Sequence, residues 1–200
     1  MKKSNPSCGG GISTSLAVAV GASVLSACVS SPRSGPYAPQ SDASRDTAAA
    51  QRLSQEAAGI LDKDPAKAER LLRDALTADV FWAPAHNSLG IICLKRGDLY
   101  QAASEFQWAA KLLPGVPEPR MNLALTLERA GRTDQALSAY GSALEVYPDH
   151  LPTLEALARL QVRARRTDDR TKHALEEIAM RGETERWREW ARQQLARAAP

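Results

Sequence analysis

Two consecutive 34-residue segments decide the fold: residues 83–116, APAHNSLGIICLKRGDLYQAASEFQWAAKLLPGV, and residues 117–150, PEPRMNLALTLERAGRTDQALSAYGSALEVYPDH. When the second segment is placed beneath the first, Leu123 falls under Leu89 and Tyr140 falls under Phe106. A fixed period of this length is typical of chains that stack copies of one helical unit. The sequence therefore predicts a repeat architecture, because one such unit cannot bury its apolar face alone.

Each segment predicts two antiparallel helices joined by a tight turn. A small residue on the first helix, Gly90 or Ala124, and a small residue on the second, Ala102 or Ala136, allow the two helices to cross closely. Phe106 and Tyr140 are expected to fill the space between adjacent units. Glycine favours the turn between the two helices, and proline marks the end of the second helix because it cannot continue one. These are Gly97 and Gly131 in the turns and Pro114 and Pro148 after the second helices.

This pattern resembles the tetratricopeptide repeat, W-x2-L-G-x2-Y…A-x3-F…P. The matching residues are Leu89, Gly90, Ala102, Phe106 and Pro114 in the first segment, and Leu123, Ala124, Ala136, Tyr140 and Pro148 in the second. The aromatic slots of the first helix depart from the pattern, with His86 and Arg120 in one slot and Cys93 and Leu127 in the other. The resemblance implies an all-α, right-handed solenoid of helical hairpins, in which the matching residues pack the units together.

Weaker units are expected on both sides, so that the solenoid covers residues 47–182, with units at about 49–82, 83–116, 117–150 and a degenerate 151–182. In the last unit the second helix slips, because Ala174 lies 38 residues beyond Ala136. We place the four extra residues in the turn around residues 165–168. Residues 183–200 predict a helix with Trp187 and Trp190 on one stripe, which either caps the solenoid or lies on a membrane surface.

The beginning of the chain predicts an export signal at residues 1–27. Lys2 and Lys3 precede an uncharged run of 14 residues, Ile12–Leu25, which is shorter than the about 20 residues that span a bilayer. The run ends on Leu-Ser-Ala-Cys at residues 25–28, which resembles the lipobox of bacterial lipoproteins. The resemblance implies that Cys28 is acylated and becomes the mature N-terminus. An ordinary secretory signal with an incidental Cys28 is the alternative.

Residues 28–46 are rich in serine and proline and predict a flexible tether, since they contain too little apolar surface to order themselves. A coil of this length holds a domain on the order of 25 Å from its anchor. Removal of the signal leaves 24 basic and 23 acidic side chains, so charge gives no indication of nucleic-acid binding. Only Cys93 then remains as a thiol, and it is expected to be a buried small hydrophobe.

Catalytic and metal-binding motifs are not recognisable in the sequence. His86, His150 and His173 lack metal-ligand spacing, and a phosphate loop or nucleophile motif does not occur. We therefore expect no enzyme, cofactor, metal, nucleic acid or small-molecule substrate. The cluster Arg159, Arg163, Arg165, Arg166 and Arg170 is interrupted by aspartates and predicts a solvated helix end, with contact to anionic lipid or an acidic partner as the alternative.

A binding groove is the main candidate site. In the tetratricopeptide-repeat family the first helix of each unit lines a concave surface that holds a peptide or a partner helix. The corresponding groove residues here are Asn87, Ile91, Leu94, Lys95, Met121, Leu125, Glu128, Arg129, Arg159 and Arg163. An apolar strip with charged edges suits an amphipathic segment of a protein partner. The alternative is that Ile91 and Leu125 pack between units. Asn122 alone matches the carboxylate clamp known in some members, so a clamp is not expected.

The repeat and the lipobox together predict a membrane-anchored adaptor or scaffold lipoprotein of a bacterial envelope assembly, facing the periplasm. Val29 and Ser30 follow the cysteine, which favours the outer over the inner membrane by the enterobacterial sorting rule. The alternatives are a pilotin-like lipoprotein of secretion or pilus assembly, an accessory non-catalytic subunit of an envelope enzyme, and a secreted repeat protein without lipid.

Overall fold

The computed structural model describes residues 45–198, and within these residues the chain is all-α, as predicted. Cys28, the predicted signal and residues 28–44 of the predicted tether lie outside the described residues. The helices are α1 (Thr47–Ile60), α2 (Pro65–Ala78), α3 (Ala83–Arg96), α4 (Leu99–Leu112), α5 (Glu118–Arg129), α6 (Thr133–Val146), α7 (Leu151–Arg163), α8 (Asp169–Arg181) and α9 (Glu185–Ala198). None of these helices combines the length and the apolar character needed to cross a bilayer.

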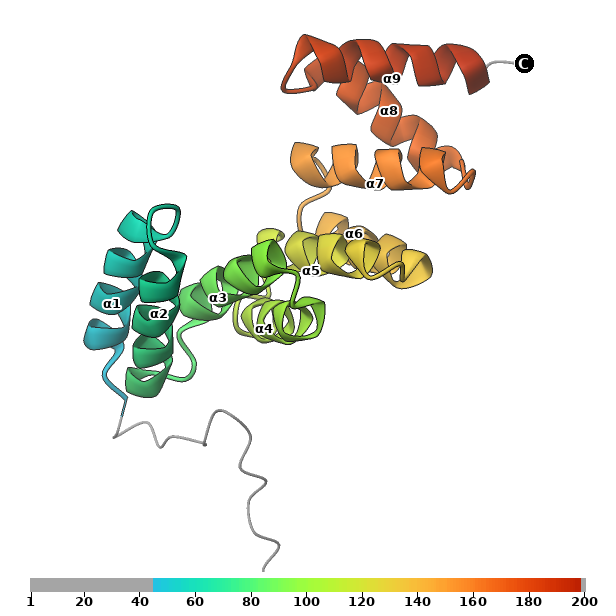
Figure 1. Cartoon of the computed structure of the whole chain (residues 1–200). Helices are drawn as coiled ribbons and strands as arrows, with labels where there is room; N and C mark the ends of the chain where they lie inside the picture. The colour runs from blue at the N-terminus through green and yellow to red at the C-terminus, as the bar shows by residue number, and fades with distance from the viewer. Residues whose placement is uncertain (1–44, 199–200) are drawn as a thin grey trace, which may run out of the picture. The chain divides into compact units, whose positions relative to one another are not determined.

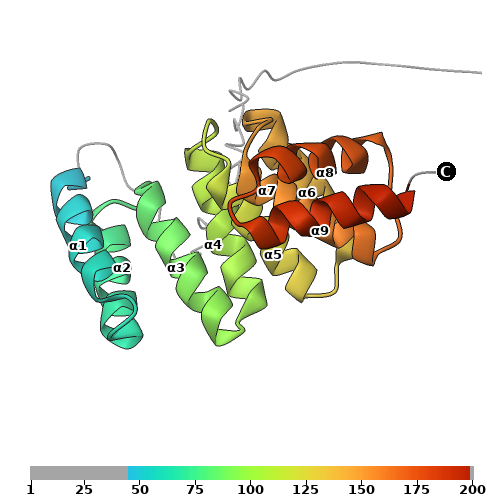
Figure 2. The same cartoon turned by 90° about the horizontal axis from the view of Figure 1, so that it is seen from above.

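Successive helices pair as hairpins, and each hairpin packs on the next. Helix α1 lies against α2, α3 against α4, α5 against α6 and α7 against α8, while α9 lies on α8 (Figures 1 and 2). The second helix of each hairpin also contacts the first helix of the following one. Neighbouring units therefore share their buried surfaces, which is how a repeat array compensates for the small core of each unit.

Local sequence explains where the helices begin and turn. The Asp64 carboxylate accepts a hydrogen bond from the Lys67 N–H at 2.9 Å, and Pro65 occupies the first position of α2. Gly97 ends α3 and Gly131 lies in the turn that follows α5. Their φ angles, 93° and 74°, fall in the left-handed region that favours glycine. These contacts and conformations partner some of the backbone groups that a helix end exposes.

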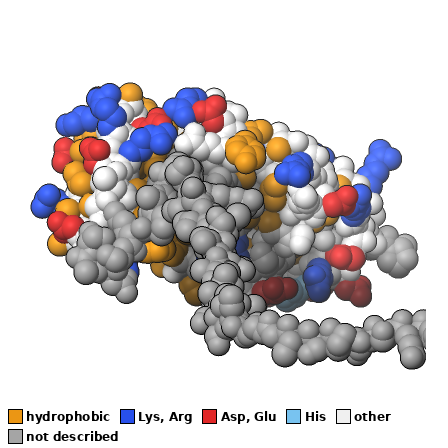
Figure 3. Space-filling view, turned by 90° about the horizontal axis from the view of Figure 1, so that it is seen from below, with side chains coloured by type: hydrophobic (Ala, Val, Ile, Leu, Met, Phe, Trp, Pro, Cys, Tyr) orange, Lys and Arg blue, Asp and Glu red, His pale blue; other side chains and the backbone are white. Residues whose placement is uncertain are grey.

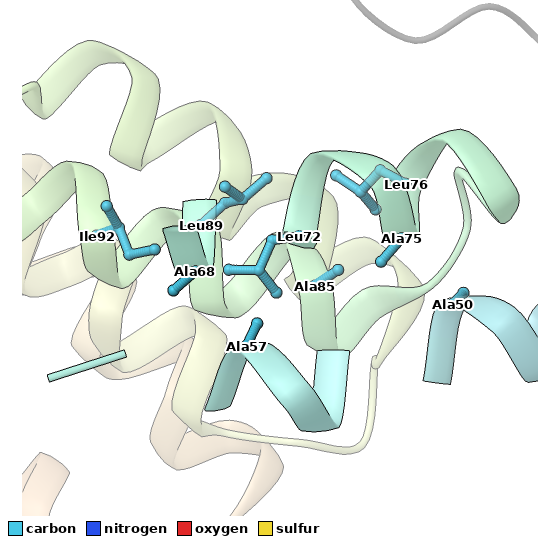
Figure 4. Packing of buried hydrophobic residues seen from close by; sticks show 9 residues of the cluster. All are labelled: Ala50, Ala57, Ala68, Leu72, Ala75, Leu76, Ala85, Leu89 and Ile92. Carbon is cyan, nitrogen blue, oxygen red and sulfur yellow. The ribbon is translucent and has the colours of Figure 1, made fainter. Parts of the chain in front are cut away.

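Small residues let α1 and α2, the two helices of the first unit, approach closely. Ala50 and Ala57 of α1 belong to one buried cluster with Ala68, Leu72 and Ala75 of α2, and Ala57 and Ala68 lie close to Leu72 (Figure 4). Leu89 of α3 belongs to the same cluster. The degenerate first unit is thus joined to the second by aliphatic packing, although it lacks the aromatic residue of the repeat pattern.

Gly90 is required by the close approach of Phe106 within the same unit. A Cβ atom on Gly90 would lie 2.6–2.9 Å from three atoms of the Phe106 ring. Phe106 also belongs to a cluster with Cys93, against which Leu123 of the following unit packs. Phe106 was expected to fill the space between units. Its ring also fills the space beside Gly90 within its own unit.

The slip in the fourth unit is divided between the loop and the helix. Five residues, 164–168, separate α7 from α8, whereas three residues, 130–132, separate α5 from α6. Helix α8 also begins five residues before Ala174, while α6 begins three residues before Ala136. The turn thus contains two of the four extra residues and the first turn of α8 contains the other two. Asp168 starts this helix through a capping box with Thr171.

The two ends of the described chain are held by side chains. Arg45 donates two hydrogen bonds to the Asp79 carboxylate at 3.0 and 3.2 Å, and Asp46 caps α1. These two residues of the predicted tether are therefore fixed to the first hairpin. At the other end, Trp187, Trp190 and Leu195 of α9 pack onto the cluster of α7 and α8 around buried Ala191. Glu185, Glu189 and Arg192 on its exposed surface form ion pairs.

Candidate partner-binding face

Side chains of α3, α5 and α7 meet on one surface, which we call the first-helix face. Asn122 of α5 donates a hydrogen bond to the Asn87 side chain of α3 at 3.2 Å, and Arg129 donates to the Leu94 carbonyl at 3.3 Å. Lys95 of α3 binds Asp62 in the α1–α2 turn at 2.9 Å. Lys95, Arg129 and Arg163 occupy equivalent positions 34 residues apart, and each binds an acceptor of the preceding unit. These predicted groove residues thus join the units as well as line the face.

Glu128 is the centre of a polar cluster on this face. Its carboxylate accepts hydrogen bonds from Arg163 at 2.8 Å and from the Tyr140 hydroxyl at 3.0 Å, and Arg159 approaches at 3.4 Å. Burial, and then the charge of Glu128, raises the pKa of Tyr140, so its hydroxyl remains protonated and donates. Only 9% of the Glu128 side chain is exposed, so this carboxylate is largely occupied by the protein itself.

The apolar residues predicted for the groove differ in exposure. Ile91, Met121 and Leu125 are half-buried, so that each keeps some surface on the first-helix face. Leu94 is only 7% exposed and belongs to the cluster of Cys93 and Phe106. The expectation that Leu94 offers its side chain to a partner is therefore not met, because the side chain turns toward α4; its carbonyl, however, accepts from Arg129.

The residues predicted to pack the repeat lie mostly inside. Leu89, Gly90, Ala102, Phe106, Ala124, Ala136 and Tyr140 are buried, Leu123 is half-buried, and Pro114 and Pro148 are exposed after α4 and α6. The exposed prolines act by ending helices rather than by packing.

A buried histidine–glutamate pair was not anticipated. The His86 Nδ1 lies 2.7 Å from the Glu105 carboxylate, its Nε2 lies 2.9 Å from the Val80 carbonyl, and the ring stacks on Trp108 with centroids 5.7 Å apart. A carbonyl only accepts, so Nε2 must donate its proton. His86 thus fills the aromatic slot of the repeat with a ring that also joins α3 to α4.

Two other carboxylates, those of Asp79 and Glu155, are buried. Burial works to raise the pKa of Asp79, but hydrogen bonds from Arg45, Thr47 and the Phe81 N–H outweigh it and the pKa lies below its ordinary value. Burial raises the pKa of Glu155 on α7, with only the Glu183 N–H opposing it at 3.4 Å. Nothing in the local sequence distinguishes these two carboxylates from the solvated ones, because their surroundings come from other units.

The first-helix face continues onto α9 as a small pocket, which we call the end pocket. It has a volume of about 400 Å³ and is lined by Arg159 of α7 and by Arg186, Trp187 and Trp190 of α9. The two half-buried tryptophan rings meet edge to face, with centroids 5.2 Å apart. This arrangement offers aromatic surface beside two guanidinium groups.

A larger cavity of about 710 Å³ lies between α6 and α8. Leu137, Leu144, Leu154 and Leu157 supply apolar walls, and the long α7–α8 loop contributes charged residues of both signs, such as Arg166 and Asp168. Arg166 is bound to Asp134, and Gln161 donates to Asp168 at 3.3 Å. The mixed charge of this rim does not select one class of ligand.

The described side chains include one free thiol, which is buried, and no cluster of metal ligands. Among residues 45–198, no three histidine, cysteine or carboxylate side chains gather as a metal site would require. Cys93 is a free thiol, is fully buried, and has a pKa that burial raises, so it is a poor nucleophile. On the face shown in Figure 3, acidic and basic side chains lie close together with hydrophobic side chains between them.

Parts of this chain are similar to known tetratricopeptide-repeat sequences. Residues 117–160 match the family model of the tetratricopeptide repeat. Tetratricopeptide repeat protein 8 of Homo sapiens is 28% identical over 109 residues, which are 54% of this chain and 20% of that protein. The corresponding protein of Mus musculus is 28% identical over 94 residues, 47% of this chain and 18% of that protein. The chain therefore spans about a fifth of the length of these curated relatives.

Solved structures share the fold. The structure titled "Functional Characterization of Pseudomonas Aeruginosa pilF" aligns with a TM-score of 0.67 and 19% identity, covering 78% of this chain and 70% of that one. YrrB, "a TPR protein with an unusual peptide-binding site", gives 0.59 and 19%, covering 74% and 76%. The first TPR of Spaghetti (RPAP3), bound to an HSP90 peptide, gives 0.58 and 13%, covering 61% and 98%. At these identities the likeness concerns the fold.

Proposed function

Because the chain belongs to the tetratricopeptide-repeat family, whose members are protein-interaction scaffolds, we propose that it is a non-catalytic adaptor that holds a segment of a partner protein on its first-helix face. The observation that supports this proposal most directly is the half-burial of Ile91, Met121 and Leu125 on consecutive first helices. These side chains form a broken apolar strip between the Asn87–Asn122 and Glu128–Arg163 contacts. An amphipathic helix or an extended segment fits a strip of this kind.

The rigidity of the face also favours a binding function. Polar bonds between units hold Asn122, Arg129 and Glu128 in place before any partner arrives. Prearranged side chains lose little conformational entropy on binding, which leaves more of the interaction energy for affinity. Two solved structures of the same fold are titled as peptide-bound or peptide-binding proteins, which gives the proposal further support.

A selection experiment tests the binding surface. Peptides of 12 residues are selected on the full chain from a phage-displayed random library, and their affinities are measured for wild type and for Met121→Glu/Leu125→Glu. The variant should bind the selected peptides at least about tenfold more weakly, because two charges replace the apolar contact. Gln107→Glu, an exposed change on α4, is the matched control. Equal affinity of the groove variant and wild type would show that the first-helix face is not the interface.

The second part of the proposal is that Cys28 anchors this adaptor to the outer membrane of a bacterial envelope, facing the periplasm. Its support is the charged start, the apolar run at Ile12–Leu25 and the Leu-Ser-Ala-Cys ending of the signal. The test is growth with an alkyne-tagged palmitate, followed by membrane fractionation. We expect label on the wild-type chain and none on Cys28→Ala, which should leave the membrane fraction. Label that persists in Cys28→Ala would exclude this anchor.

A further inference from the structure

The end pocket combines two features that recur at binding hot spots, tryptophan and arginine. Trp187 and Trp190 lie three residues apart on α9, and their packing onto α8 and Ala191 holds both rings half-buried. The exposed part of each ring therefore faces solvent in a fixed orientation. A cavity of about 400 Å³ is large enough for one large side chain and part of its backbone.

The guanidinium groups of the pocket have donors to spare. Arg186 is exposed and has no hydrogen-bond or ion-pair partner among the described residues. Arg159 contacts Glu128 only at 3.4 Å, while Arg163 and Tyr140 bind that carboxylate more closely. A guanidinium has five N–H donors, so Arg159 can bind a further anion.

Arg159 shares the Glu128 carboxylate with Arg163, and the other carboxylates near the pocket are buried or held by other side chains. None of the four residues that line the pocket is acidic. On α9, Glu185 is held by Arg188 and Arg192, and Glu189 is held by Arg192 and Gln193. Glu155, one turn before Arg159, is 7% exposed and accepts a hydrogen bond from the Glu183 N–H at 3.4 Å. The end pocket is therefore electropositive and aromatic.

We propose that the end pocket anchors an acidic segment of the partner protein, in which an aromatic or large aliphatic side chain lies on Trp187 and Trp190 while a neighbouring carboxylate binds Arg159 and Arg186. The proposal rests on the proposed function, because it adds a second contact to the same face. Charge complementarity selects the occupant: a carboxylate accepts hydrogen bonds from both guanidinium groups, and the adjacent apolar side chain covers the rings. The α9 helix thus both covers α8 and contributes to recognition.

The test uses the full chain and three fluorescein-labelled heptapeptides with blocked ends. One has a phenylalanine flanked by two aspartates, the second has asparagines in place of the aspartates, and the third has serine in place of the phenylalanine. Fluorescence anisotropy measures their affinities for wild type, Arg186→Glu, Trp190→Leu and Arg197→Glu. Arg197 is exposed on the last turn of α9 and is the matched control. Circular dichroism confirms that each variant retains its helices.

We expect the aspartate–phenylalanine peptide to bind wild type and Arg197→Glu alike, and at least about tenfold more weakly to Arg186→Glu and Trp190→Leu. Either altered peptide should lose a similar factor, and added salt should weaken binding of the acidic one. Equal binding of the aspartate and asparagine peptides, or an unaffected Arg186→Glu, would overturn the proposal. Because Arg186 is exposed, its variant remains informative even if Trp190→Leu disturbs α9.

A membrane surface is the competing source of negative charge. Sedimentation with phosphatidylglycerol vesicles is therefore measured for wild type and Arg186→Glu in parallel. Vesicle binding that depends on Arg186, without binding of the acidic peptide, would assign the pocket to lipid and overturn the proposal. The heptapeptides test the end pocket, whereas the library-selected peptides test Met121 and Leu125. The end pocket and the proposed function can thus fail independently.

Discussion

Replacement of Gly90 by alanine should destabilise the second unit by overpacking it. The new Cβ would lie 2.6, 2.7 and 2.9 Å from three atoms of the Phe106 ring. Carbon atoms in contact prefer about 3.5–4.0 Å, so the ring or α3 must move by roughly 1 Å. Phe106 is fully buried and its neighbours in the cluster leave little room for this movement.

Two opposing contributions determine the magnitude. An extra methyl group in a well-packed core costs about 1–3 kcal/mol. Alanine is favoured over glycine in a helix interior by roughly 1 kcal/mol, which reduces the net loss. Since three ring atoms clash at once and the ring has no exposed edge, the cost should lie in the upper part of this range. We expect the free energy of unfolding to fall by about 1–2 kcal/mol.

Urea unfolding followed by circular dichroism measures this change, with Gly141→Ala as the matched control. Gly141 also lies within a helix, α6, but a Cβ there would meet nothing within 4 Å. Gly141→Ala should therefore raise the free energy of unfolding by about 0.5–1 kcal/mol. In a Phe106→Leu background the loss caused by Gly90→Ala should shrink, because the clashing ring is absent. Equal and favourable effects of Gly90→Ala and Gly141→Ala would refute the close approach of Phe106.

Three further predictions concern ionisable and polar side chains. Glu155→Gln should raise the free energy of unfolding by about 1 kcal/mol at pH 7 and have less effect at pH 4. Burial raises the folded-state pKa of Glu155, so the wild-type residue costs the protein stability as the pH rises above the unfolded-state pKa. An effect of the substitution that is equal at both pH values would contradict this. Asp168→Ala should lower the free energy of unfolding by about 1 kcal/mol near pH 7, and by progressively less as the pH falls below about 4. The reason is that hydrogen bonds from the Thr171 N–H and hydroxyl lower the pKa of Asp168, and this stabilisation disappears when the carboxylate is protonated. Urea unfolding in both pH ranges measures the difference. Tyr140→Phe should cost about 1–2 kcal/mol in thermal or urea unfolding, since Glu128 loses one of its donors, and a neutral result would show that the Arg163 contact suffices.

Much of the fold could be predicted because its signals are local. The 34-residue spacing of alanines, leucines and aromatic residues predicted hairpins, and α3 to α6 lie where that spacing placed them. Asp64–Pro65 and the turn glycines acted through backbone preferences that depend only on neighbouring residues. The loop before α8 was located from the 38-residue spacing between Ala136 and Ala174, although half of the extra length lies in the helix.

The candidate site was less predictable, because its charges are used inside the protein. Glu128, Arg129 and Lys95 were expected to await a partner, but each already binds a group of a neighbouring unit. The end pocket could be suspected from Trp187 and Trp190 among arginines, yet its fourth member, Arg159, comes from α7. Bonds of this kind join residues 27–35 positions apart, and helix periodicity does not specify the rotation of one unit on the next.

The sequence by itself determined the order, length and pairing of the helices, because period, caps and turn residues act within one hairpin. Only the tertiary structure decided that His86 and Glu105 form a hydrogen-bonded pair in the core, that Leu94 turns inward, and that Arg159 meets α9. The physical reason is that burial and charge pairing depend on side chains from several units at once. The same residue type therefore lies in solvent in one unit and in the core of another.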